Sequence, residues 1–201
     1  FIEFINLGTL LALIIYFRKR IWKIIKDVFK ERNYKLALNI VITCIPAGII
    51  GLLLSGLIED NPFFSSLYTI AIAMGVVGLI MIAIDKIPHM SALKDENHLT
   101  PVRALIIGLS QVFALIPGTS RSGTTIVAGR IVGLDSESAA EYSFLAAIPL
   151  MFGVCLKMLI SDGAYLAENI GPLLLGNLVA LLVGLFAIRF VLRYLKKPKT
   201  H

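Results

Sequence analysis

The sequence has few of the residues from which metal and redox sites are built. It contains two cysteines and three histidines in 201 residues, and Cys44 and Cys155 each lie inside an apolar run. Neither cysteine has metal-ligand spacing or a redox motif, so we interpret both as small buried hydrophobic residues. The GxxxxGK[ST] phosphate-binding loop is absent. The first residues are already apolar, and nothing in them resembles the basic start of a signal peptide.

Charged residues are also scarce, and acidic ones are outnumbered. They make up 16% of the chain, with 13 Asp and Glu against 19 Lys and Arg, a formal net charge of +6. A positive net charge could indicate nucleic-acid binding. Most of the basic residues flank apolar runs, however, which is the positive-inside pattern of membrane topology. We therefore expect no nucleic-acid partner.

Apolar residues dominate what is present. They form 57% of the chain, and the mean hydropathy is +0.85. Soluble domains are nearer 45–50% apolar, and about 200 residues cannot build a core large enough to bury such an excess. Because the apolar residues cluster in long runs, we predict an all-α, polytopic integral membrane protein with one transmembrane domain over residues 1–201.

Five apolar segments are candidate spanning helices: 4–17, 36–58, 67–84, 142–160 and 172–195. The first is shorter than the ~20 residues that a span needs, and the other four are long enough or nearly so. Pro46 and Pro149 lie inside two of these segments and are tolerable as kinks. We expect about five spanning helices.

A basic segment over 18–35 follows the first apolar run. It carries eight Lys or Arg against Asp27 and Glu31, and its apolar residues recur at helical spacing. This composition predicts an interfacial amphipathic segment on the cytoplasmic side, in contact with anionic membrane lipids.

Residues 101–134 form a further hydrophobic element that does not fit a single crossing. Loops 59–66 and 161–171 contain no Lys or Arg, whereas the C-terminal end is basic. If 101–134 crossed once, the charge rule would be inverted at 161–171 and at the C-terminal end. We therefore predict a re-entrant helical pair: a half-helix, a turn, and a second half-helix too short to span.

The turn of this pair reads PGTSRSGTT over 117–125. An arginine at membrane depth requires an anionic partner, and the guanidinium fork of Arg121 suits phosphate or carboxylate. Gly118 and Gly123 permit positive φ and close backbone approach. We expect a helix to start near Thr124, with its free N–H groups directed at the turn. Short hydroxyl donors surround the arginine: Thr119, Ser120, Ser122, Thr124 and Thr125.

These features predict an oxyanion site at the turn. The alternative is an ordinary structural turn in which Arg121 pairs with a carboxylate such as Glu141. Gln111 and Glu141 are weaker candidates for the site. Gln111 could face the cavity or form a helix–helix hydrogen bond, and Glu141 could act in catalysis or be solvated at the interface.

Residues 108–149 resemble the second signature region of the undecaprenyl-diphosphate phosphatases, the bacitracin-resistance protein family. The family pattern PGxSRSG is matched over 117–123, and Thr125 and the run AAEYSFLAAIP over 139–149 agree as well. Residues 5–20 are similar to the family's third helical element, with Asn6 where Gln is usual. The resemblance covers nearly the whole chain.

The resemblance implies a reaction and a fold. The family removes the terminal phosphate of undecaprenyl diphosphate, which regenerates the lipid carrier for cell-wall synthesis at the bacterial cell membrane. Its fold has six spanning helices and two re-entrant pairs arranged as inverted repeats. A faint echo between IPAGIIG (45–51) and IPLMFG (148–153) fits such a repeat. By resemblance, Arg121 grips the diphosphate, and Ser120 and Thr125 contribute to binding or catalysis.

One departure from the family limits this expectation. No residues match its acidic motif, Glu-x-x-x-Glu followed by PVSSTGH, and no final spanning helix follows the C-terminal end, so we expect a fragment truncated at both ends. The resemblance also implies a divalent cation (Mg or Ca), although no ligand set is visible, and leaves a homo-oligomer open. The alternatives to a phosphatase are a polyprenyl-phosphate transporter or flippase and a structural membrane subunit.

Overall fold

The computed structural model describes residues 3–59, 61–86, 93, 96–161 and 169–195. Every regular element in these ranges is a helix, and none is a strand, which confirms the all-α prediction. The chain divides into two compact units, the first made of Phe1–Arg32 with Ala147–His201 and the second of Asn33–Ala146.

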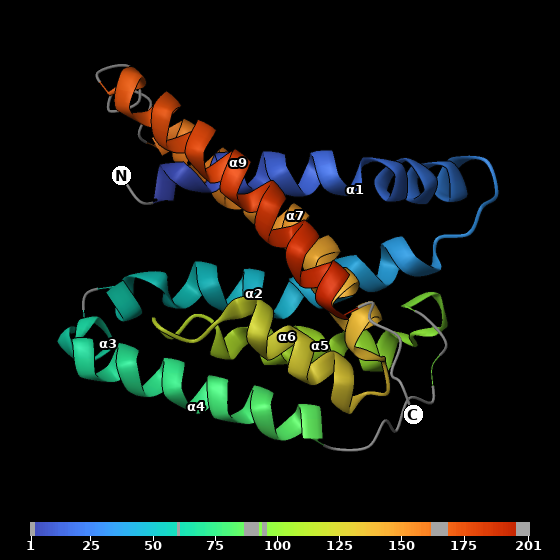
Figure 1. Cartoon of the computed structure of the whole chain (residues 1–201), viewed down its shortest axis with the longest axis horizontal. Coiled ribbons are helices and arrows are strands. Elements are labelled where there is room, and N and C mark those ends of the chain that lie inside the picture. Colours follow the sequence, from blue (N-terminus) through green and yellow to red (C-terminus); the bar gives the residue numbers. More distant parts are fainter. Residues whose placement is uncertain (1–2, 60, 87–92, 94–95, 162–168, 196–201) are drawn as a thin grey trace. The chain divides into compact units, whose positions relative to one another are not determined.

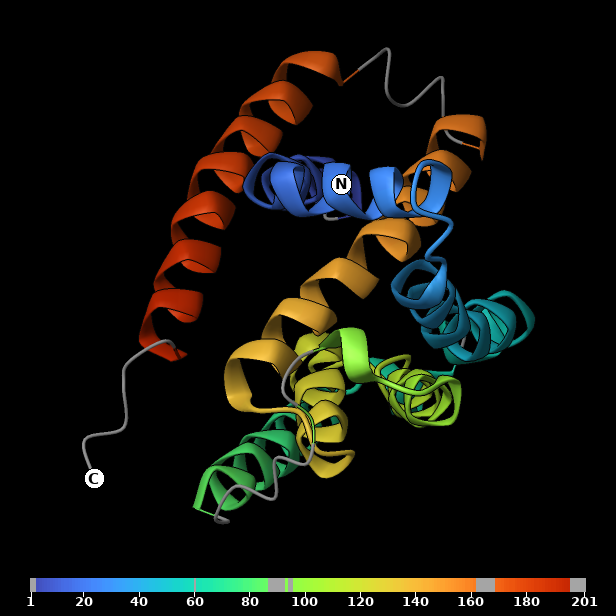
Figure 2. The ribbon, with the colours of Figure 1, turned by 90° about the vertical axis from the view of Figure 1, so that its right-hand side faces the viewer.

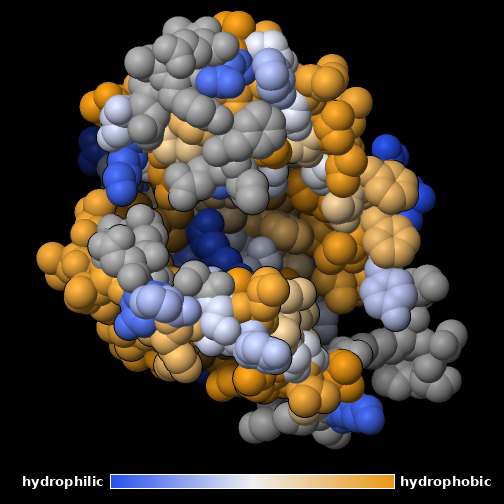
Figure 3. Space-filling view, turned by 90° about the vertical axis from the view of Figure 1, so that its left-hand side faces the viewer, coloured by the Kyte–Doolittle hydropathy of each residue, from blue (hydrophilic) through white to orange (hydrophobic). Residues whose placement is uncertain are grey.

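Four described helices are long and apolar enough to cross a membrane: α2 (Lys35–Glu59), α4 (Leu67–Lys86), α7 (Ser136–Ser161) and α9 (Ile170–Leu195). They correspond to the predicted segments from 36–58 onward, and α7 begins earlier than predicted. Apolar side chains cover much of the surface in the view of Figure 3. The chain is therefore a multi-pass membrane protein.

In the first unit, helix α1 (Asn6–Phe29) packs against α9, and a short 3₁₀ turn (Glu3–Ile5) precedes it (Figures 1 and 2). The backbone N–H of Gly8 donates to Asn177 Oδ1 at 2.6 Å. A Cβ atom at position 8 would collide with the carbonyl group of Asn177. Glycine at this position therefore lets the two helices approach closely.

Helix α1 differs from the prediction. The sequence predicts a short apolar segment over 4–17 followed by a distinct interfacial segment over 18–35, but one helix joins them as far as Phe29. No glycine or proline interrupts the run after Gly8, so the helical hydrogen bonds continue through the basic residues. Buried residues end at Phe17, where the basic residues begin. The predicted interfacial segment is therefore the second half of α1 and the short link to α2.

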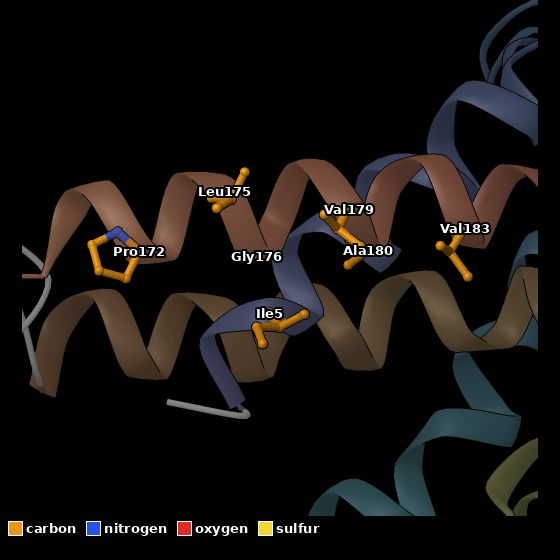
Figure 4. Close-up of a pocket in the computed structure, with 7 residues that line it drawn as sticks. All are labelled: Ile5, Pro172, Leu175, Gly176, Val179, Ala180 and Val183. Carbon is orange, nitrogen blue, oxygen red and sulfur yellow. The ribbon is translucent and has the colours of Figure 1, made fainter.

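An apolar groove of about 580 Å³ lies in the first unit (Figure 4). Its lining consists only of apolar residues: Ile5, Pro172, Leu175, Gly176, Val179, Ala180 and Val183. Because it offers no polar side chain to a phosphate, this groove is not the oxyanion site predicted from the sequence.

In the second unit, α5 (Pro101–Phe113) packs along α2, and α6 (Arg121–Ile131) packs against both α5 and α4 (Figure 1). Helix α3 (Pro62–Ser65) and a 3₁₀ turn (Glu96–His98) complete its described elements. At 1.5 Å per residue, α5 and α6 are about 20 and 16 Å long, short of the ~30 Å hydrocarbon core. Residues 101–134 thus contain the two short helices joined by a turn that the sequence predicts.

Candidate functional site

The turn between α5 and α6 is closed by its own backbone. Three consecutive 3₁₀-type bonds, beginning with Ala114 N–H to Gln111 O at 3.0 Å, tighten the end of α5. Thr119 N–H then donates to Ile116 O at 3.0 Å. Between them Gly118 has φ +90°, which a side chain would disfavour. The positive φ predicted for Gly118 is confirmed.

Two glycines let the turn and α6 lie directly on α4. A Cβ atom at Gly118 would overlap the backbone of Ile70, lying 2.8 Å from its Cα. A Cβ atom at Gly123 would lie 3.0 Å from a methyl group of Val77. Gly123 has no positive φ, because it is in the first turn of α6, and it uses only the close approach that a glycine permits. Both glycines serve packing against α4.

Helix α6 begins at Arg121, earlier than the predicted start near Thr124. Ser120 is its N-cap, because the Ser120 hydroxyl oxygen accepts from Gly123 N–H at 3.1 Å and the carbonyl accepts from Thr124 N–H at 2.9 Å. Serine favours this position for that reason. The N–H groups of Arg121 and Ser122 have no partner among the described residues, and they point out of the helix end.

The Arg121 side chain is half-buried and is held by two neutral groups. Its Nε donates to Gln111 Oε1 at 3.1 Å, and its Nη2 donates to the carbonyl oxygen of Ala146 on α7 at 3.3 Å. The Cys44 thiol of α2 donates to the same carbonyl at 3.4 Å. Within the described residues, these hydrogen bonds of the Arg121 side chain reach no carboxylate, neither Glu141 nor another. The alternative that Arg121 pairs with Glu141 therefore finds no support.

The charge of this arginine is only partly compensated. Burial lowers the pKa of the Arg121 guanidinium below its ordinary value. An arginine nevertheless remains protonated at neutral pH. A buried cation loses the stabilisation that water gave its charge, and neutral acceptors replace only part of it. An anion bound beside the cation, at the positive end of the helix dipole, supplies the rest.

A network of buried hydrogen bonds lies behind Arg121. Gln111 is 2% exposed, and its Nε2 donates to the Thr43 carbonyl oxygen of α2 at 2.8 Å. The Thr43 hydroxyl donates to Ala104 O at 3.0 Å and lies 2.7 Å from the Tyr142 hydroxyl. Tyr142 in turn donates to the Asn39 carbonyl at 2.9 Å. Helices α2, α5 and α7 are thereby joined beneath the site.

The hydroxyl residues of the turn divide into two groups. Thr125 is buried, and its hydroxyl contacts the Arg121 carbonyl at 3.0 Å and the Ser143 hydroxyl of α7, so it fastens α6 to α7. Thr124 donates to the Arg121 carbonyl at 2.9 Å. Ser120 is exposed, and Ser122 and Thr119 are half-buried. The structure thus keeps Ser120 accessible and places Thr125 inside the helix packing.

The residues around Arg121 do not form a metal site of their own. Among the described residues, no cluster of three or more His, Cys, Asp or Glu side chains could hold an ion. Mg²⁺ and Ca²⁺ prefer carboxylate oxygens. Glu141 is half-buried on α7 and has interactions of its own. The donor set near Arg121 therefore does not fit a divalent cation without further ligands.

Sequence reasoning missed Thr43, Tyr142 and the Ala146 carbonyl. A signal for the first of these exists, because Asn39 and Thr43 are polar residues four apart inside an apolar run. Polar pairs at that spacing in a spanning helix usually hydrogen-bond to a neighbouring helix. No local pattern identifies a backbone carbonyl as a partner of Arg121.

Comparison with known proteins identifies related sequences. The family model described as "Bacitracin resistance protein BacA" matches residues 1–201. The chain is 40% identical over 203 residues to "Undecaprenyl-diphosphatase 1" of Clostridioides difficile (strain 630), with 98% of the chain and 73% of the relative covered.

Two other relatives have similar names. The chain is 37% identical over 202 residues to "Undecaprenyl-diphosphatase" of Lachnoclostridium phytofermentans, covering 96% of the chain and 72% of the relative. The "Undecaprenyl-diphosphatase" of Neisseria meningitidis serogroup C is 34% identical over 197 residues, covering 96% of the chain and 71% of that protein.

Proposed function

Because this chain belongs to the bacitracin resistance protein BacA family, we propose that Arg121 is the residue with which it holds a lipid diphosphate during hydrolysis. The shared name of the relatives gives the reaction, in which undecaprenyl diphosphate and water yield undecaprenyl phosphate and inorganic phosphate. The relatives support this hydrolase function and lend no support to the transporter alternative.

One observation carries the proposal: a half-buried guanidinium with only neutral partners lies at the N-terminus of a helix. Phosphoryl transfer depends mainly on positioning and on stabilising the charge that develops on the phosphate oxygens. Arg121 supplies a fixed positive charge for that purpose. The free N–H groups of Arg121 and Ser122 add the positive end of the α6 dipole.

The accessible hydroxyls of the turn add further hydrogen-bond donors for the phosphate. The oxygen of Ser120 accepts from Gly123, so its hydrogen remains available to a phosphate oxygen. Ser122 and Thr119 stand on either side of the cap and Arg121, and we assign them to phosphate binding. The hydroxyl of Thr125 is held within the protein, and we assign it to positioning α6. Gly118, Gly123 and Thr124 shape the turn and do not touch the substrate.

Other parts of the reaction are not assigned to described residues. Hydrolysis needs an activated water, or a nucleophile with its base, as well as the anion site. The divalent cation implied by the resemblance stays a prediction. Contact of the basic half of α1 with anionic membrane lipids, and a homo-oligomeric state, also stay predictions.

The kinetic test replaces the arginine and measures phosphate release from a polyprenyl diphosphate by the intact natural protein in detergent. Arg121→Ala should lower kcat/KM by about 10³-fold or more, because a transition-state charge is lost. Arg121→Lys, which keeps a point charge without the fork, should retain part of the activity.

Arg103→Ala is the matched control, since it removes the same charge from the neighbouring helix α5. Its turnover should stay within about threefold of wild type, because this residue is away from the turn. Unchanged turnover in Arg121→Ala, with the protein folded and membrane-inserted, would remove Arg121 from the mechanism.

A further inference from the structure

We propose that Gln111 is a positioning residue that sets the orientation of the Arg121 guanidinium, so that the outer end of its fork faces the diphosphate. The inference rests on the proposed function of Arg121. It adds a second residue, from a different helix, on which diphosphate recognition depends, and it explains why an amide occupies a buried position in α5.

The two ends of the Gln111 amide have different partners. Its Nε2 donates to the Thr43 carbonyl of α2 at 2.8 Å, which fixes the direction in which the amide oxygen points. That oxygen accepts from Arg121 Nε at 3.1 Å. A side chain at this place must both donate and accept. Glutamate only accepts when ionised, and methionine offers neither function with strength.

The contacts of Arg121 use one side of its fork. Gln111 takes Nε, and the Ala146 carbonyl takes one hydrogen of Nη2 at 3.3 Å. A guanidinium has five N–H groups. Three therefore remain, two on Nη1 and one on Nη2, and Nη1 with Nη2 forms the outer end of the fork. Two parallel hydrogen bonds to phosphate oxygens suit this end of the fork.

The carbonyl that holds Gln111 and the carbonyl that holds Arg121 both lie three residues before a helix proline. Thr43 precedes Pro46 in α2, and Ala146 precedes Pro149 in α7. A helix proline removes the donor to the carbonyl four residues earlier, and its ring distorts that turn, which includes the adjoining carbonyls of Thr43 and Ala146. Neighbouring helices then satisfy polar groups of that turn. The two Ile-Pro pairs noted in the sequence therefore each follow one of these carbonyls along the chain.

Close packing of α5 on α2 brings Gln111 within reach of Thr43. A Cβ atom at Gly108, one helical turn before Gln111, would lie 2.7 Å from the Thr43 carbonyl oxygen and 3.0 Å from its Cα. Only glycine permits that distance. The amide of Gln111 therefore spans from the α2 backbone to the arginine without a bridging group.

The test replaces Gln111 in the intact protein and compares kcat and KM. Gln111→Met has similar volume and helix propensity but cannot orient the guanidinium, so kcat/KM should fall about 10- to 100-fold, as for other groups that orient a functional residue. Gln111→Glu should be worse and should raise KM, because its carboxylate neutralises the guanidinium and faces the Thr43 carbonyl.

A double-mutant cycle with Arg121→Lys separates positioning from general packing. If Gln111 acts through the guanidinium, Gln111→Met should cost no more than about threefold in the Arg121→Lys background. Ser110→Ala, which removes a contact of α5 with Thr124 O at 3.4 Å but does not touch Arg121, is the control and should change turnover less than threefold.

Equal losses from Gln111→Met in both backgrounds, or no loss in either, would overturn the positioning role. If Gln111→Met does not fold, the uncharged Gln111→Leu takes its place in the cycle. Failure of the proposed function has a different signature, because Arg121→Ala would then turn over substrate as fast as wild type. In that case, titration calorimetry with inorganic diphosphate decides: weaker binding by Gln111→Met only when Arg121 is present supports the proposal, and equal binding contradicts it.

Discussion

Arg121 and Gly118 lie three positions apart in the chain and have different tasks. The arginine offers a charge to the ligand, whereas the glycine allows the turn to rest on the backbone of α4. At the residue scale, the site therefore depends on the charged side chain of Arg121 and on the lack of a side chain at Gly118. A substitution at either position should lower activity for a different reason.

Gly118→Ala should destabilise the protein as well as the site. The residue has φ +90°, and an added Cβ atom would overlap the backbone of Ile70. The left-handed conformation alone costs about 1–2 kcal/mol for a residue with a side chain. We expect a loss of about 2 kcal/mol or more in unfolding free energy, measured by thermal or denaturant unfolding in detergent, together with reduced turnover.

Gly75→Ala is the matched control for that prediction. Gly75 lies on α4, the helix that Gly118 contacts, and an added Cβ atom there would meet nothing within 4 Å. Alanine should be neutral or stabilising by up to about 1 kcal/mol in a helix. If Gly118→Ala unfolds no more readily than Gly75→Ala, the close approach to α4 does not constrain the turn.

The sequence predicted the chemical character of these residues better than their contacts. Positive φ at Gly118 follows from local composition, because glycine between apolar arms marks a turn. The contact of Gln111 with Thr43 joins residues 68 apart in the chain. The helical spacing of residues within one segment cannot predict a contact between two segments. The buried role of Thr125 was missed for the same reason, because its partner Ser143 lies on another helix.

At the scale of elements, helix lengths follow from the apolar runs, but helix ends depend on single capping residues. The four long apolar runs correspond to α2, α4, α7 and α9. Ser120 starts α6 three residues before the predicted position, so Arg121 is in the first helical turn. The position of this helix start matters for function, because it places Arg121 at the positive end of the α6 dipole, where both can act on one anion.

Helix α1 gives a prediction at this scale. Trp22, the only tryptophan of the 201 residues, is 72% exposed within the basic half of the helix. If this half lies on anionic headgroups, brominated phosphatidylglycerol should quench Trp22 fluorescence more strongly than brominated phosphatidylcholine. Lys23→Gln should reduce the preference for the anionic lipid about fivefold, which corresponds to about 1 kcal/mol per lysine near the surface.

Lys157→Gln removes an equal charge from α7 and serves as the control for the fluorescence experiment. Its quenching should match that of wild type. Equal quenching of wild-type Trp22 by the two brominated lipids would contradict an anionic surface at α1.

At the scale of the whole molecule, the described site belongs to one unit. Arg121, Gln111, Thr43, Tyr142 and Ala146 all lie within Asn33–Ala146, whereas α1 and α9 pack in the other unit. Four apolar helices and their exposed apolar faces (Figure 3) suit a lipid surrounding, in which a polar cluster is stable only when it is enclosed by protein. The α5–α6 hairpin provides that enclosure for Arg121.

The central claim is that Arg121 at the start of α6 binds the diphosphate of a polyprenyl substrate. A structure of the intact protein with a non-hydrolysable polyprenyl methylene-diphosphate tests it most directly. We predict phosphate oxygens about 3 Å from Arg121 Nη1 and Nη2 and from the N–H of Ser122, with the Gln111 contact retained. A diphosphate bound elsewhere, with Arg121 contacted only by Gln111 and Ala146, would contradict the account.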